Sequence, residues 1–185
     1  MRWLFKKTTD LSEEEYAAVY EGLSSSRKAH IDQMKQEEDK KRSLLASALV
    51  AELLQAEGVT AKLENDADGR PFLRGSDLFV SISHSHQGVA CAIDHQPVGI
   101  DLEQIRPVRK SLVEYVCLPE ELAYVIQSPQ PDTVTDPDTL QRFFQVWTAK
   151  EACFKKHRDL VLLKINTLLL ETTLCITDGF FINII

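Results

Sequence analysis

The sequence predicts an α+β fold on the basis of two helical segments and a group of strands. Residues 38–57 carry leucine and alanine side chains along a broad apolar stripe at helical spacing, and residues 139–156 show a second strong helical pattern. Residues 78–103 contain three short apolar runs with β-branched side chains. We therefore expect long helices combined with short antiparallel strands.

The N-terminal half is expected to begin with a short strand at residues 2–5. Ser12 precedes three glutamates, which predicts a helix N-cap because its hydroxyl can accept from the first helical turn. A second helix is predicted at residues 27–34, and Gly58 is expected to end the long helix. Residues 65–69 form a predicted turn. Strands follow at 78–83, 88–94 and 98–103, and the short link before residue 98 predicts that the last two pair as an antiparallel hairpin.

The C-terminal half is predicted to be mainly helical up to residue 156. Helices are expected at residues 108–116 and 119–126, followed by an exposed loop at residues 128–138 that holds three prolines and three aspartates. After the helix at 139–156, residues 162–185 are aliphatic and β-branched, with a turn signal at Asp178-Gly179. This segment is expected to form a closing hairpin.

The composition indicates a globular chain of one ordinary domain or two small lobes. The chain has 185 residues, of which 44% are hydrophobic and 26% charged. No apolar run approaches the roughly 20 residues needed to cross a bilayer, and Lys6 and Lys7 interrupt any N-terminal signal-peptide core. We expect a cytoplasmic protein without a disulfide framework, in which Cys91 and Cys153 are reduced core residues. The net charge of −7 argues against nucleic-acid binding.

Two short segments carry the chemistry. In Val98-Gly99-Ile100-Asp101-Leu102-Glu103, the two carboxylates share one face of a strand because strand side chains alternate. In Trp147-Thr148-Ala149-Lys150-Glu151-Ala152-Cys153-Phe154-Lys155, Glu151 and Lys155 share one face of a helix. Three carboxylates and one lysine suit a hard divalent cation and a phosphate. The alternative is a solvent-facing strand pair and an exposed helical ion pair.

The same two segments resemble the two-part signature of the 4′-phosphopantetheinyl transferases, in the form found in the surfactin-type (Sfp-like) branch. Two further segments, Val80-Ser81-Ile82-Ser83-His84-Ser85 and Gly69-Arg70-Pro71-Phe72, resemble a Ser-His-Ser segment and a Gly-Lys-Pro-aromatic turn of that family. All four occur in the order of the family, over about residues 27 to 156. The resemblance implies two similar α/β lobes in a pseudo-twofold arrangement, here residues 1–104 and 105–185, with the second lobe shortened at its C-terminus.

The resemblance also implies an activity. Members transfer the 4′-phosphopantetheine arm of coenzyme A to a serine of an apo acyl or peptidyl carrier protein and release 3′,5′-ADP. The implied metal is Mg²⁺, held by Asp101, Glu103 and Glu151, because Mg²⁺ favours a few carboxylates together with phosphate oxygens. Glu151 would also be the general base, and Lys155 would stabilise the transferring phosphate or protonate the leaving oxygen. Coenzyme A would be bound by Arg27, Lys28, Arg42, Arg70, Pro71, Ser83, His84 and Lys155.

The carriers of fatty-acid, polyketide and nonribosomal-peptide synthesis are all possible acceptors on this interpretation. The protein is expected to act as a monomer, without nucleic-acid or membrane partners. Two alternatives stay open. One is a catalytically degenerate homologue that binds a carrier protein or coenzyme A. The other is an unrelated magnesium phosphohydrolase, which would need neither the helix around Glu151 nor the turn around Pro71.

Overall fold

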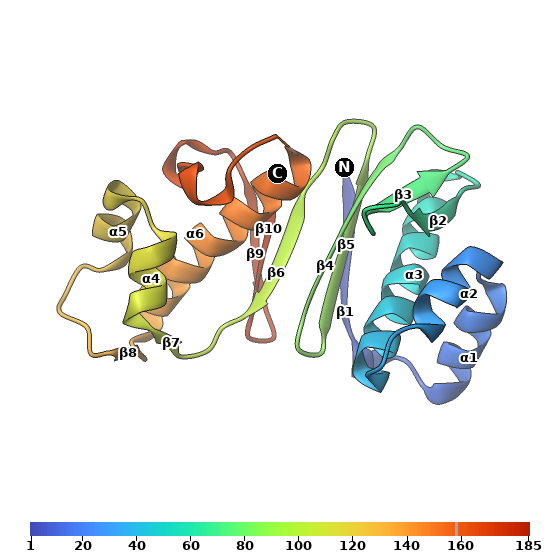
Figure 1. Ribbon diagram of the computed structural model, residues 1–185, viewed down its shortest axis with the longest axis horizontal. Helices are drawn as coiled ribbons and strands as arrows, with labels where there is room; N and C mark the ends of the chain where they lie inside the picture. Colours follow the sequence, from blue (N-terminus) through green and yellow to red (C-terminus); the bar gives the residue numbers. More distant parts are fainter. Residues whose placement is uncertain (158) are drawn as a thin grey trace. The chain divides into compact units, whose positions relative to one another are not determined.

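The computed structural model describes residues 1–157 and 159–185 (Figure 1). It contains helices and several small antiparallel sheets, so the predicted α+β class is confirmed. The chain divides into two compact units, Met1–Val98 and Gly99–Ile185. Among the described residues, no helix is both long and apolar enough to span a membrane.

The first unit is a three-stranded antiparallel sheet covered by a long helix. The sheet has the order β1-β5-β4, formed by β1 (Arg2–Lys7), β4 (Phe79–Ser85) and β5 (Gly88–Asp94). Helix α3 (Glu37–Glu57) packs on β5 and β1, as Figure 1 shows. The remaining elements are η1 (Thr8–Asp10), α1 (Glu13–Gly22), α2 (Ser25–Asp32) and the hairpin of β2 (Lys62–Asn65) and β3 (Pro71–Arg74).

The predicted signals of this unit explain its helix ends and its core. The Ser12 hydroxyl accepts from the backbone N–H of Glu15, so the predicted N-cap of α1 is confirmed. Gly58 ends α3 with a φ of 69°, a left-handed conformation that glycine adopts without a Cβ penalty. The leucine stripe of α3 is buried together with the apolar side chains of β5, which fixes the helix against the sheet.

The second unit also contains a three-stranded antiparallel sheet with a long helix packed on it. Its sheet has the order β6-β10-β9, formed by β6 (Ile100–Gln104), β9 (Thr173–Thr177) and β10 (Phe180–Ile184). Helix α6 (Pro137–Lys156) packs across β6 and β10. The other elements are β7 (Val108–Arg109), α4 (Lys110–Val116), α5 (Pro119–Val125), β8 (Thr133–Val134), η2 (Leu162–Lys164) and η3 (Thr167–Leu169).

Two strand predictions need correction. The predicted hairpin of residues 88–94 with 98–103 is wrong: β5 has β1 on one edge and β4 on the other, and β6 pairs antiparallel with β10. The predicted closing hairpin over 162–185 is restricted to β9 and β10, because the segment before them forms the 3-10 turns η2 and η3. The turn at Asp178-Gly179 is confirmed, and both residues have positive φ angles, 50° and 78°.

Candidate functional site

Strand β6 separates its apolar and acidic side chains onto two faces. Ile100 and Leu102 are buried on one face, and Asp101 and Glu103 lie on the other, as strand alternation requires. Contacts from α6 side chains to Asp101 and Glu103 show that the helix crosses the acidic face. The predicted two-carboxylate face therefore lies under the helix that carries the second motif.

Gly99 sets how closely α6 approaches β6. A Cβ built on Gly99 would lie 1.8 Å from the carbonyl oxygen of Ala152 and 3.0 Å from the backbone nitrogen of Lys156. Any side chain at position 99 would have to push the helix away. The glycine of the motif is therefore required by a backbone-to-backbone contact that brings Glu151 and Lys155 down to the strand.

Lys155 and Asp101 form the central ion pair of this site. The Lys155 ammonium lies 2.7 Å from Oδ1 of Asp101 and also donates to the carbonyl of Ile100 at 3.2 Å. Asp101 is only 5% exposed, so its carboxylate would be costly to bury without a cation. The two motifs, distant in sequence, are thus joined by a direct charged contact.

The other two carboxylates lie close enough to affect each other. The indole N–H of Trp147 points to Oε1 of Glu103 at 3.4 Å. Burial raises the pKa of Glu151, and the negative charges of Asp101 and Glu103 raise it further, against the opposing effect of Lys155. A carboxyl with a raised pKa next to other carboxylates is typical of general bases and of cation sites.

These residues fit a hard cation by their donor chemistry. Carboxylate oxygens are the protein ligands that Mg²⁺ accepts, and like charges around Glu151 would be neutralised by a divalent ion. In the described part of the chain, however, no three His, Cys, Asp or Glu side chains are arranged so that they could hold a metal ion. Lys155 supplies the cation next to Asp101 in this arrangement.

Lys150, which sequence reasoning left without a role, is fully buried on another side of α6. Its ammonium lies 2.7 Å from Oε2 of Glu121, which is fully buried too, and also donates to the carbonyl of Ile165. Oε1 of Glu121 accepts from the backbone N–H and the hydroxyl of Thr167, both at 2.7 Å. This pair ties α5, α6 and the segment before β9 together directly beside Glu151.

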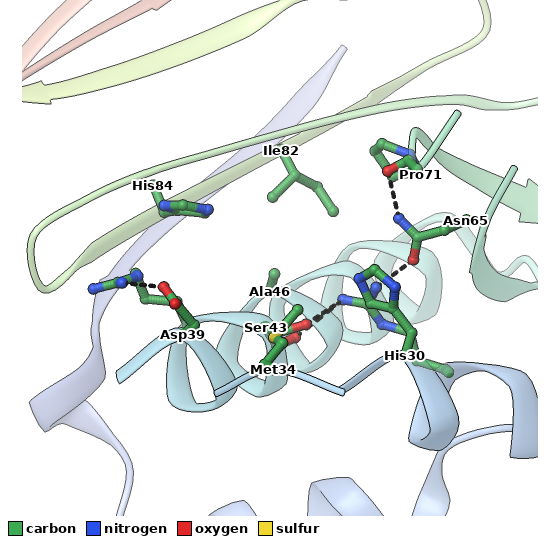
Figure 2. A pocket seen from close by; sticks show the side chains of 12 residues that line it. His30, Met34, Asp39, Ser43, Ala46, Asn65, Pro71, Ile82 and His84 are labelled. Carbon is green, nitrogen blue, oxygen red and sulfur yellow. Dashed lines mark hydrogen bonds and ion pairs between the residues drawn. The ribbon is translucent and has the colours of Figure 1, made fainter. Parts of the chain in front are cut away.

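The first unit contains a separate cavity of about 390 Å³. Figure 2 shows His84 and Ile82 of β4 on one side and Ser43 and Ala46 of α3 on the other. The remaining lining residues are Arg27, His30, Met34, Asp39, Arg42, Asn65, Gly69 and Pro71. Of the residues predicted to bind coenzyme A, the cavity therefore brings together Arg27, Arg42, Pro71 and His84.

Arg27 is built into the wall of this cavity. It is 5% exposed, and its guanidinium donates to Asn65 Oδ1 at 2.5 Å, to Ser43 Oγ at 2.8 Å and to Ser47 Oγ at 3.3 Å. Burial lowers the pKa of Arg27 below its usual value. The side chain connects α2, α3 and β2, so its hydrogen bonds hold the cavity in shape.

Arg42 lies at the cavity with a different set of contacts. One of its terminal nitrogens donates to the carbonyl of His86 at 2.8 Å, and the other pairs with Asp39. The side chain is 19% exposed. Lys28 and Arg70 are not among the lining residues. Lys28 instead pairs with Glu21 at 3.1 Å, and Arg70 is exposed on the turn before β3.

Ser83 and His84 are adjacent in sequence but lie on opposite faces of β4. His84 is exposed and lines the cavity with Ile82, whereas Ser83 is buried on the other face. Only the histidine of the predicted pair is therefore part of the cavity wall.

Sequence reasoning gave no site role to eight of the lining residues: His30, Met34, Asp39, Ser43, Ala46, Asn65, Gly69 and Ile82. His30 lies in the last turns of α2, whereas Met34 follows the end of that helix at Asp32, so the expected helix over residues 27–34 is two residues too long. Burial lowers the pKa of His30, and the neighbouring Arg27 lowers it further, so the imidazole is mainly neutral at pH 7. Asn65 was assigned only to a turn.

Comparison with known proteins identifies relatives. The sequence pattern of the 4′-phosphopantetheinyl transferase superfamily matches residues 97–173. A 4′-phosphopantetheinyl transferase of Bacillus subtilis is 32% identical over 89 residues, which are 48% of this chain and 37% of that protein. The 4′-phosphopantetheinyl transferase gsp of Aneurinibacillus migulanus is 31% identical over 121 residues, covering 63% and 48%. The 4′-phosphopantetheinyl transferase Sfp of Bacillus subtilis strain 168 is 26% identical over 152 residues, covering 80% and 65%.

The chain is thus similar to the 4′-phosphopantetheinyl transferase superfamily over residues 97–173, and Sfp is among its relatives. The resemblance to this family is thus confirmed, and the matched range contains two of the four segments, those around Asp101 and Glu151. The matched range 97–173 contains Asp101, Glu103, Glu151 and Lys155. The chain spans 37% to 65% of the length of the relatives named above.

Proposed function

We propose that this protein transfers the 4′-phosphopantetheine arm of coenzyme A to a serine hydroxyl of an apo carrier protein, with release of 3′,5′-ADP. The observation that carries the proposal is the meeting of the two motifs on one face of β6. Asp101 is paired with Lys155 at 2.7 Å, and Asp101 and Glu103 both act on the pKa of Glu151. Such a group of carboxylates with one lysine suits phosphoryl transfer, which depends on positioning and charge stabilisation.

Asp101, Glu103 and Glu151 would hold Mg²⁺ in this proposal. A bound Mg²⁺ would neutralise negative charge on the diphosphate of coenzyme A. The Lys155 ammonium, which pairs with Asp101 in the structure, would act on the phosphate that is transferred. Lys155 then stabilises the negative charge on that phosphate or returns a proton to the leaving oxygen.

Glu151 would take the proton from the attacking serine. Its carboxyl is half-buried beside Asp101 and Glu103, and burial together with their negative charge raises its pKa. The serine oxygen forms a bond to the phosphorus of the pantetheine phosphate while the bond from that phosphorus to the 3′,5′-ADP oxygen breaks. The proton from the serine reaches Glu151 directly or through one water molecule.

The cavity of the first unit would receive the phosphorylated nucleotide end of coenzyme A. Arg42 supplies a forked guanidinium that suits a phosphate, and His84 and Pro71 supply a polar and an apolar wall. Lys28, Arg70 and Ser83 stay predictions as ligands. We further propose that the two units are the lobes of the family. The shared strand order, β1-β5-β4 in one and β6-β10-β9 in the other, supports a pseudo-twofold relationship.

The test is intact-mass spectrometry of an apo carrier protein incubated with this protein, coenzyme A and Mg²⁺. We expect a mass gain of one phosphopantetheine, which EDTA and the variant Glu151→Gln abolish. Glu52→Gln, which changes an exposed carboxylate on α3, is the matched control and should leave the gain unchanged. If several carriers gain no mass while coenzyme A binds, the protein is a binding module and the proposal is wrong.

A further inference from the structure

The cavity of the first unit contains a buried positive charge that is not paired with an acid. Among the described residues, the guanidinium of Arg27 donates to neutral oxygens, those of Asn65 at 2.5 Å, Ser43 at 2.8 Å and Ser47 at 3.3 Å. The side chain is 5% exposed. A buried cation whose partners are all neutral creates a positive potential around it, and this potential attracts an anion into the cavity.

Arg42, the second arginine of the cavity, already has a counterion. It pairs with Asp39, which is the only acidic side chain in the described lining, and it also donates to the carbonyl of His86 at 2.8 Å. The two guanidinium charges are therefore compensated to different degrees. The charge that still needs an anion is that of Arg27 on α2.

His30 lies on the same face of α2 as this charge. It follows Arg27 at the i, i+3 spacing that makes two helical side chains neighbours, and both residues line the cavity. The imidazole is half-buried, and it makes no hydrogen bond with the residues that the structure describes. Its ring nitrogens are therefore available to a ligand that binds beside Arg27.

The groups around His30 favour a neutral imidazole as long as the cavity holds no anion. Burial lowers the pKa of His30, and the positive charge of Arg27 lowers it further. The other lining side chains that carry or can take a charge come from α3 and β4, and they are Asp39, Arg42 and His84 (Figure 2). Asp39 and Arg42 pair with each other. The lining residues of the β2–β3 hairpin carry no charge.

We propose that His30 is a phosphate-binding residue whose imidazole takes up a proton from solvent when a phosphate of the nucleotide enters the cavity beside Arg27. A phosphate monoester brings about two negative charges at pH 7, which favour the imidazolium form of the ring. The added N–H then donates to a phosphate oxygen in a charge-assisted hydrogen bond. The inference rests on the proposed function, which places the nucleotide end of coenzyme A in this cavity.

Proton uptake determines the direction of the pH dependence. In the free protein the pKa of His30 lies below its ordinary value of 6.5, and a bound phosphate raises it. Affinity for the nucleotide therefore increases as the pH falls from about 8 to about 6.5, by up to about tenfold per pH unit where one full proton is taken up. Below about pH 6 the phosphate itself becomes protonated, which opposes the effect.

The first experiment is titration calorimetry with 3′,5′-ADP at about pH 7.5 in two buffers of different ionisation enthalpy. The dependence of the measured enthalpy on the buffer gives the number of protons taken up on binding. We expect uptake by the wild-type protein that His30→Gln removes. His95→Gln changes an exposed histidine outside the cavity and should leave the uptake unchanged. His30→Lys carries a fixed charge, so at about pH 8 it should bind several-fold more tightly than wild type and lose the pH dependence.

The second experiment follows the His30 ring directly by proton NMR. Its Hε1 signal, assigned by its loss in His30→Gln, should titrate at higher pH in the complex with 3′,5′-ADP than in the free protein. An unchanged midpoint overturns the proposal. Binding without proton uptake also overturns it, as does uptake that His84→Gln removes and His30→Gln leaves intact, or a lack of 3′,5′-ADP binding at every pH.

These measurements need no carrier protein, so they separate the inference from the proposed transferase activity. Proton uptake through His30 with no mass gain on any carrier would contradict the proposed function alone. A mass gain on a carrier, together with nucleotide binding that takes up no proton, would contradict the role of His30 alone.

Discussion

The Lys155 ammonium lies 2.7 Å from Oδ1 of Asp101, although the two residues are 54 positions apart in the sequence. The contact connects the C-terminal turns of α6 to the acidic face of β6. It places one positive charge among three carboxylates, of which Glu151 has a pKa raised by burial and by its acidic neighbours. The pair therefore joins α6 to β6, and its lysine partly compensates the negative charge of the proposed site.

Replacing Lys155 by methionine should destabilise the protein and increase its response to Mg²⁺. Without the ammonium, the carboxylate of Asp101 stays buried near two other acids, at an expected loss of about 1 to 3 kcal/mol. Thermal unfolding measures the loss, and added Mg²⁺ should restore part of it. Lys164→Met, which removes an exposed lysine of η2, is the control and should change little. Equal unfolding temperatures for the two variants would contradict the assigned role of the ion pair.

Replacing Gly99 by alanine should separate α6 from β6. The added Cβ would meet the carbonyl oxygen of Ala152 at 1.8 Å, and neither backbone can move without breaking its own hydrogen bonds. We expect destabilisation of about 1 to 3 kcal/mol or more, with loss of transferase activity. Gly22→Ala is the matched control, because a Cβ at Gly22 meets nothing within 4 Å. Urea unfolding of both variants decides the point: similar midpoints would mean that the close approach is not required.

The buried pair of Glu121 and Lys150 should make stability fall at acid pH. Burial by itself raises the pKa of Glu121, but hydrogen bonds from Lys150, Thr167 and the backbone of Leu118 outweigh it and hold the pKa below its ordinary value of 4.5. The contribution is fully present above that unfolded-state value and is lost as the pH falls through the lower folded-state pKa. Glu121→Gln should remove this dependence.

The same pair should show strong coupling in a double-mutant cycle. Glu121→Leu or Lys150→Met alone leaves one buried charge without its partner and should cost about 3 to 5 kcal/mol. The double variant should recover much of this loss, because no charge then stays buried. Unfolding free energies of the four proteins at pH 7 give the coupling. Additive losses would show that the two side chains act separately.

Local signals predicted the elements of this fold well. Ser12, Gly58 and the Asp178-Gly179 turn act within a few residues of chain, and each has the predicted role. The pairing of β6 with β10 was missed because strand partners depend on contacts between segments far apart in sequence. The connection before Val98 is short enough for a hairpin, but β1 already occupies the edge that β6 would need.

In the candidate site too, the local features were predicted from the sequence and the tertiary contacts were not. The spacing of Asp101 and Glu103, and of Glu151 and Lys155, predicted which side chains share a face, because strand and helix periods are local. It did not predict that Lys150 and Glu121 form a fully buried pair or that Arg27 is enclosed by Ser43, Ser47 and Asn65. Whether a charged side chain is buried depends on which residues surround it in the tertiary structure. The spacing of residues along the sequence does not contain that information.

The two arginines of the first-unit cavity should give opposite results when they are replaced. Arg27 is 5% exposed and donates to three side chains, so Arg27→Met leaves several buried acceptors unmet and should cost about 2 to 3 kcal/mol of stability. Arg42 has fewer fixed contacts, and Arg42→Ala should leave the unfolding temperature nearly unchanged.

For ligand binding, the order of the two substitutions should be reversed, and Arg42→Ala should have the larger effect. Calorimetry with 3′,5′-ADP should give roughly tenfold weaker binding for Arg42→Ala, because a guanidinium–phosphate contact is charge-assisted. Arg74→Ala removes an exposed arginine that pairs with Glu64 outside the cavity, and it should bind as wild type. If Arg27→Met unfolds at the wild-type temperature but loses affinity, Arg27 is a ligand-binding residue. The hydrogen bonds that enclose it would then have to open when the phosphate binds.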